Sequence, residues 1–78
     1  MKFENTIPLS DALINNNYKI VDNPNQKYFE LGLYNGSEVY IFKTNDRNLV
    51  IAVGASRYII PKKVAKHIMV IRSEYPPL

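Results

Sequence analysis

The residues whose side chains can do chemistry are few and widely spaced in this 78-residue sequence. His67 is the only histidine, there is no cysteine, and no carboxylate stands at a spacing typical of a metal site around it. None of the serines, at positions 10, 37, 56 and 73, has a histidine partner in a recognisable catalytic arrangement. The sequence therefore predicts no enzyme, no metal site and no cofactor, and alternation from Ile68 and Val70 predicts that His67 is an ordinary surface residue.

Recognition is the chemistry that the remaining side chains favour. Large aromatic residues bury much area on contact, and Tyr keeps a hydroxyl for hydrogen bonding. Basic residues gather after position 56 and can meet phosphates or an acidic protein surface. We predict that a partner binds through these two kinds of residue, namely Tyr34, Tyr40, Phe42, Arg57, Lys62 and Lys63.

Charge and composition limit the classes of protein that this chain can belong to. Residues 1–39 carry three lysines against five carboxylates, whereas residues 40–78 carry seven Lys or Arg against two carboxylates. An apolar content of 46% excludes a disordered chain, and no apolar run reaches the roughly 18 residues that cross a bilayer. The first residues do not resemble a secretory signal, and the absence of cysteine favours the cytosol. We expect one domain over residues 1–78, with its core at about 9–71 and a tail at 72–78.

Short apolar runs separated by turn residues predict a mainly β protein. Ser10 is the expected N-cap of a helical turn at 9–14, the Asn residues at 15–17 end it, and Gly32 ends a helix at 26–31. Pro61 is expected to open another helical turn. Five strands are expected, at 18–21, 38–44, 49–53, 56–60 and 67–71. So few residues leave no room for parallel crossovers, so we predict a small, partly open barrel of antiparallel strands. The order of elements favours an SH3-like over an OB-like barrel.

Alternation within the strands assigns a core face and an outer face. The expected core comprises Val39, Ile41, Leu49, Ile51, Val53, Tyr58 and Ile60. The opposite faces then carry Tyr40, Phe42, Ile59 and Met69, which is more outward apolar surface than a small monomer usually shows. This surface is covered by the helix and terminal segments, or it serves as a docking patch or the seam of a homodimer.

A resemblance to a known family rests on the middle of the chain. Residues 31–39 read LGLYNGSEV and resemble the L-G-[LI]-x-x-G-[ST]-x-[VI] signature of the ferrous iron transport protein A family, FeoA. The spacing continues through Ile51-x-Val53, Arg57-x-x-Ile60 and Ala65-x-x-Ile68-x-Val70, so the similarity covers about residues 9–71. The chain departs from the family pattern at Asn15 and Ala55, where the family has glycine, and in a loop shortened to residues 45–48.

The resemblance implies an SH3-like accessory protein of ferrous iron uptake that binds and modulates FeoB, a membrane transporter bearing a GTPase domain. The chain would be cytoplasmic and recruited to the inner face of the membrane through this partner, without inserting into it. Two other functions stay open: a small barrel acting in regulation, associated with a repressor or binding nucleic acid, and a homodimeric interaction module. Nucleic acid is not favoured, because Tyr58, the aromatic residue beside Arg57, points inward by alternation.

Overall fold

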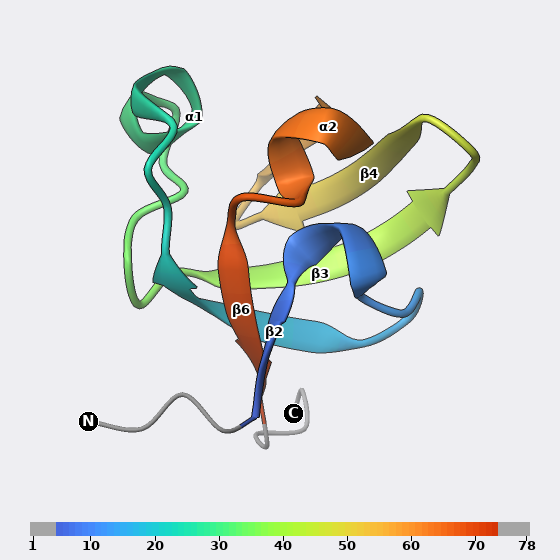
Figure 1. Ribbon diagram of the computed structural model, residues 1–78, viewed down its shortest axis with the longest axis horizontal. Helices are drawn as coiled ribbons and strands as arrows, with labels where there is room; N and C mark the ends of the chain where they lie inside the picture. Colours follow the sequence, from blue (N-terminus) through green and yellow to red (C-terminus); the bar gives the residue numbers. More distant parts are fainter. Residues whose placement is uncertain (1–4, 74–78) are drawn as a thin grey trace.

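Six antiparallel strands form one open sheet in the computed structural model, which describes residues 5–73 (Figure 1). The strands occur in the spatial order β1-β6-β2-β3-β4-β5, so β1 and β5 form the two edges. Their bounds are β1 Thr6–Pro8, β2 Asn17–Asp22, β3 Glu38–Thr44, β4 Asn48–Val53, β5 Ser56–Pro61 and β6 Met69–Arg72. A 3-10 helix, η1 (Leu9–Asp11), and two short helices, α1 (Gln26–Glu30) and α2 (Lys62–Ala65), complete the fold. The prediction of a mainly β, antiparallel and partly open scaffold is confirmed.

The sheet curls around a core formed by the inward side chains of five strands. Figure 1 shows α2 and η1 together on the concave side, while α1 stands at one end of the molecule. The fully buried large side chains are Leu9, Ile20, Leu33, Val39, Ile41, Leu49, Ile51, Ile60, Ile68 and Val70. Five of the seven predicted core residues are among them, and the other two, Val53 and Tyr58, are half-buried and pack against this cluster.

Local sequence explains where α1 begins and ends. The side chain of Asn25 accepts a hydrogen bond from the backbone N–H of Tyr28 at 3.1 Å, which caps a helix whose first N–H groups have no partner within it. Gly32 follows at φ +119°, a conformation that only glycine adopts without strain. The chain then turns back, so that Leu33 is fully buried and the backbone is aimed into β3.

Three local predictions were wrong. Ser10 does not cap the first turn: it lies inside η1, whose N-cap is Pro8 with no side-chain hydrogen bond. The last strand is Met69–Arg72 rather than 67–71, because the N–H groups of His67 and Ile68 bond back to α2. Pro61 ends β5 and is the N-cap of α2, one residue before the expected position.

The two ends of the described chain pair with each other. β1 pairs with β6 from Thr6↔Ile71 to Pro8↔Met69, which adds a sixth strand to the five that the sequence predicts. Ordered backbone continues past residue 71, since Arg72 belongs to β6 and the N–H of Ser73 donates to the Asn17 carbonyl at 2.9 Å. Residues 74–78 of the predicted tail lie outside the described residues.

Candidate partner-binding surface

The convex surface of β3, β4 and β5 carries most of the predicted binding residues. Cross-strand register aligns Tyr40 with Ala52 and Arg57, and Lys43 with Val50 and Ile59, so these side chains point away from the core. The β3–β4 register shifts between Ile41 and Lys43, a bulge that leaves Phe42 as the extra residue of β3. We call this surface the outer face: Tyr40, Phe42, Lys43, Val50, Ala52, Arg57 and Ile59.

Two large apolar side chains of the outer face remain exposed. Phe42 is 44% exposed and Ile59 is 66% exposed, the highest value among the large apolar residues described. Neither helix covers them, so the alternative in which the helices shield this face fails for these two residues. The outward orientation that strand alternation predicted for both of them is confirmed.

Arg57 lies over the ring of Phe42. The guanidinium carbon is 4.3 Å from the ring centroid, within the range in which the ring quadrupole attracts a cation. The contact joins two predicted binding residues from different strands into one amphipathic unit. Such a unit offers a partner an aromatic edge and a planar set of N–H donors that suits a carboxylate.

Tyr40 has its hydroxyl engaged within the protein. It donates a hydrogen bond to the Asn15 Oδ1 at 3.0 Å, and Asn15 lies in the turn before β2. Asn15 has φ +64°, so it holds the left-handed turn for which the FeoA pattern uses glycine. Tyr40 is half-buried, and the hydrogen bond to Asn15 already uses the proton of its hydroxyl.

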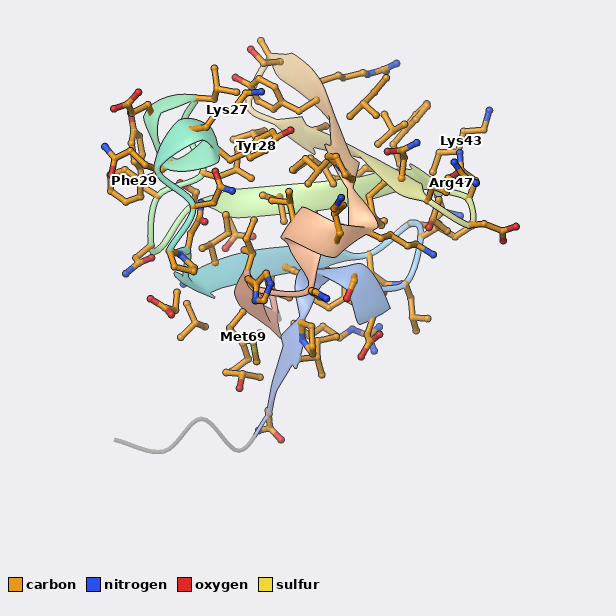
Figure 2. The ribbon with its side chains drawn as sticks, turned by 45° about the horizontal axis from the view of Figure 1, so that its top comes forward. Lys27, Tyr28, Phe29, Lys43, Arg47 and Met69 are labelled. Carbon is orange, nitrogen blue, oxygen red and sulfur yellow. The ribbon has the colours of Figure 1, made fainter. Side chains whose placement is uncertain are left out.

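Lys62 and Lys63 belong to a basic cluster at one end of the outer face. The N–H of Lys62 donates to the Arg47 carbonyl at 2.7 Å, which draws the β3–β4 turn against the start of α2. Here an open cleft of about 390 Å³ is lined by Asp46, Arg47, Asn48, Pro61, Lys62 and Lys63. In Figure 2 Lys43 and Arg47 lie together at this end of the molecule, opposite α1. The sequence analysis missed Arg47, because it assigned residues 45–48 only a role as a turn.

Tyr34 lies in a different cluster. Its ring packs edge-on against Phe29 of α1, with centroids 5.0 Å apart and planes at 76°. Tyr34 is 49% exposed, and Phe29 and Leu31 are exposed beside it. The hydroxyl of Tyr58 donates to the Leu31 carbonyl at 2.8 Å and so connects this segment to β5. The predicted binding residues therefore fall into two groups, and sequence reasoning missed Phe29 in the second.

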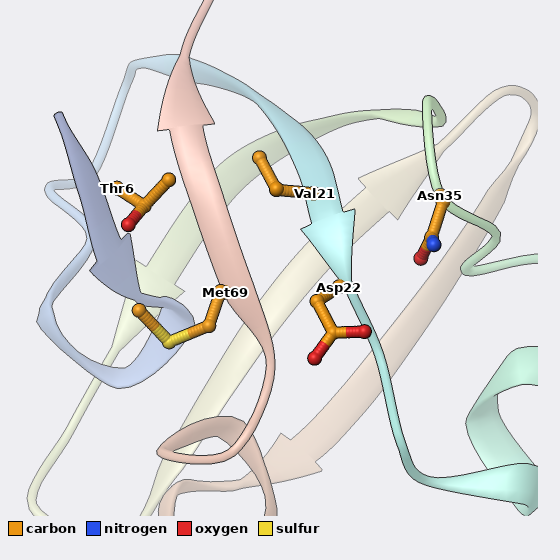
Figure 3. A pocket seen from close by; sticks show the side chains of 5 residues that line it. All are labelled: Thr6, Val21, Asp22, Asn35 and Met69. Carbon is orange, nitrogen blue, oxygen red and sulfur yellow. The ribbon is translucent and has the colours of Figure 1, made fainter. Parts of the chain in front are cut away.

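A second cleft, of about 460 Å³, lies beside the bulge in the pairing of β2 with β6. Its lining includes Val21, Asp22, Asn35 and Met69 (Figure 3). Met69, predicted to point outward, is half-buried here. The cleft has one carboxylate, and nowhere in residues 5–73 do three or more His, Cys, Asp or Glu side chains gather as a metal site requires. His67 is exposed, as predicted. Within the same residues, no helix has the length and apolar character needed to span a membrane.

Comparison with known protein families identifies the class. The model of the FeoA domain family matches residues 7–72, which is most of the chain. The protein belongs to the FeoA domain family. Among curated proteins, none matches this chain.

Two solved structures share the fold. A crystal structure of an iron uptake regulatory protein, FeoA, superposes with a TM-score of 0.80 at 27% identity, covering 87% of this chain and 97% of that one. An NMR structure of a FeoA-like protein from Clostridium acetobutylicum superposes with a TM-score of 0.77 at 21% identity, covering 100% of this chain and 98% of that one. The second likeness is one of fold alone.

Family membership supports involvement in ferrous iron transport. The family consists of small accessory domains and is not a known enzyme family. The resemblance on residues 31–39 thus identified the correct family, and its glycines serve the backbone, with Gly32 at φ +119° and Gly36 at φ +93°.

Proposed function

We propose that this chain is a cytoplasmic accessory protein of ferrous iron uptake that binds and modulates a FeoB-type membrane GTPase transporter. The outer face and the adjoining basic cluster form the binding surface. Binding to this transporter would bring the chain to the inner face of the membrane without inserting it.

One observation carries this proposal: the Arg57–Phe42 pair on the exposed side of a sheet whose inner side packs against the hydrophobic core. Phe42 and Ile59 leave apolar area in water on one face of the sheet, and exposed apolar area bordered by polar and charged residues is typical of protein interaction sites. Aromatic residues and Arg are enriched where protein interfaces concentrate their binding energy. Arg47, Lys62 and Lys63, with Asp46 as the one carboxylate of their cleft, add a positive rim that suits an acidic partner surface.

Titration of the purified transporter tests the proposal. The polytopic GTPase of the same genome is titrated with the wild-type chain and with the Tyr40→Ala/Phe42→Ala variant, by calorimetry or fluorescence anisotropy. We expect the variant to bind at least about tenfold more weakly, since residues at the centre of an interface commonly contribute more than 1.4 kcal/mol. GTP hydrolysis by the transporter is measured in the same samples to detect modulation.

Two further variants identify the surface that binds. Arg57→Ala is expected to weaken binding and Lys27→Ala, which removes the same charge from α1, is the matched control expected to leave it unchanged. Tyr34→Ala tests the separate cluster beside α1. If Tyr34→Ala weakens binding while the outer-face variants do not, the surface is assigned wrongly; if the wild-type chain does not bind the transporter, the proposed function is wrong.

A further inference from the structure

β5 is an edge strand whose outer backbone groups have no partner within the described chain. It pairs only with β4, from Val53↔Ser56 to Asn48↔Pro61, and the other edge of the sheet is β1. The two-residue connection Gly54–Ala55 makes Val53 and Ser56 a hydrogen-bonded pair, so pairs alternate from there along the ladder. By this alternation Arg57 and Ile59 turn their N–H and C=O groups away from β4.

No other group satisfies these four backbone atoms. Among residues 5–73, none of the backbone or side-chain hydrogen bonds outside the strand ladders involves the N–H or C=O of Arg57 or Ile59. β5 ends at Pro61, which has no N–H. The N–H of the next residue, Lys62, already donates to the Arg47 carbonyl and is not available to an added strand. The free edge is therefore short and presents two donors and two acceptors. An exposed edge of this kind is a template for another strand.

The side chains of the same two residues lie on the outer face. Ile59 exposes 66% of its surface directly beside the free edge, and Arg57 lies over Phe42. An added strand would extend the outer face, so that its alternate side chains contact these two residues. One side-chain position would be apolar, opposite Ile59, and another would be acidic, opposite Arg57.

The charge of β5 decides whether its free edge suits a second copy of this chain or a strand of another protein. A second copy of this chain pairing β5 with β5 would set two Arg57 side chains diagonally across the seam, and β5 contains no acidic residue to balance them. Lys62 and Lys63 follow directly, and no ion pair engages any of these three cations within residues 5–73. Like charges across strands oppose pairing, whereas carboxylates on a foreign strand would complement all three cations.

We propose that β5 binds an extended acidic segment of a partner protein by strand addition, with an apolar side chain against Ile59 and carboxylates facing Arg57 and the Lys62/Lys63 pair. This inference rests on the proposed function and deepens it, because it names how the partner is held. The side chains of Arg57 and Ile59 would select the sequence of the bound segment, and their backbone N–H and C=O groups would fix how that segment aligns with β5.

An NMR titration with a defined peptide tests strand addition. The probe is a blocked eight-residue peptide, Glu-Thr-Val-Thr-Glu-Thr-Val-Thr, whose Glu and Val lie two residues apart on one face, as Arg57 and Ile59 do, and the matched control replaces each Glu by Lys. We expect the Glu peptide to shift the amide signals of Arg57 and Ile59 and to slow their hydrogen exchange about tenfold, as new hydrogen bonds protect them. The Lys peptide is expected to have no effect. Shifts confined to other strands, or an equal response to both peptides, would overturn the proposal.

Variants at one position separate the backbone from the side chain. Ile59→Pro removes the outward N–H without touching the β4–β5 ladder and is expected to abolish peptide binding. Ile59→Thr keeps the N–H and is expected to weaken binding only severalfold. Should the proline variant unfold in a thermal melt, a Glu–Val peptide N-methylated at alternate residues removes the complementary donors instead, and it is expected not to bind. Undiminished binding of that peptide contradicts strand addition.

The same variants distinguish this inference from the proposed function. A transporter that binds wild type and Ile59→Pro equally well refutes strand addition and leaves the proposed partner intact. A transporter that binds neither, while the Glu peptide still protects Arg57 and Ile59, refutes the proposed partner and retains the acidic-strand chemistry. Dimerisation through β5, seen by light scattering and lost in Ile59→Pro, would overturn the choice of occupant.

Discussion

The turn before β2 offers a test in which backbone strain and a hydrogen bond can be measured separately. Asn15 has φ +64° and its Oδ1 accepts a hydrogen bond from the Tyr40 hydroxyl at 3.0 Å. Tyr40→Phe removes the hydrogen bond alone. Asn15→Gly removes it and leaves a residue suited to positive φ, whereas Asn15→Ala removes it and strains the backbone.

The expected losses of stability differ enough to be resolved. An exposed hydrogen bond contributes about 0.5–1 kcal/mol, so Tyr40→Phe should lower the free energy of unfolding by about that amount. Asn15→Ala should be about 1 kcal/mol less stable than Asn15→Gly, because alanine resists the left-handed conformation even after the extra freedom of glycine in the unfolded chain is counted. In a domain of this size 1 kcal/mol corresponds to about 4–8 °C in Tm.

Thermal and urea denaturation followed by circular dichroism measure these differences. Equal Tm values for Asn15→Ala and Asn15→Gly would refute the argument that the backbone conformation selects the residue. A loss in Tyr40→Phe as large as that in Asn15→Ala would show instead that the hydrogen bond is the main contribution. Tyr40→Phe keeps the ring that the outer face presents, so we expect its affinity for the transporter to match that of the wild type.

Three more predictions concern the packing and the loops, each read from chemical denaturation. Phe42→Ala should lower the free energy of unfolding by about 1–2 kcal/mol, because Phe42 is 44% exposed. Ile51→Ala should lower it by about 2–5 kcal/mol, because Ile51 is 0% exposed. Equal losses would show that Phe42 is a core residue. Asn23 is buried and hydrogen-bonds two loop groups at 2.9 Å, so Asn23→Ala should cost about 1–3 kcal/mol, and a neutral result would contradict that role. Gly32→Ala at φ +119° should destabilise more than Gly54→Ala at φ +59°, where the left-handed region admits alanine; the reverse order would refute the assignment.

Elements determined by neighbouring residues could be predicted, and those determined by distant pairing could not. β3 was predicted with its observed bounds, Glu38–Thr44, because β-branched and aromatic residues run between two clear turns. β1 has three residues and ends in proline, so no local signal distinguishes it; it is a strand because β6 lies beside it. The start of β6 was misplaced for a related reason, since the N–H groups of His67 and Ile68 donate to carbonyls of α2 rather than to a neighbouring strand.

The candidate site shows the same division. Alternation alone predicted that Phe42 and Ile59 lie outside, and both are exposed. It could not predict that the bulge at Phe42 would bring its ring under Arg57, because a bulge is defined by the register between two strands. Arg47 likewise joins Lys62 through a backbone hydrogen bond between segments far apart in the chain. Spacing in the sequence carries no signal for such contacts.

The inner face of β3–β5 forms the core and the outer face stays exposed, which explains how so small a domain can devote residues to recognition. The inner side chains of these strands, Val39, Ile41, Leu49, Ile51 and Ile60, are almost wholly removed from water. Stability therefore depends chiefly on them, and the outer residues are free to be selected for a partner. If the outer side chains also formed the core, substitutions that altered the binding surface would lower the free energy of unfolding. Because the open sheet also leaves the outer edge of β5 without a neighbouring strand, side-chain contact and strand addition can act together at one place, where Arg57 and Ile59 serve both.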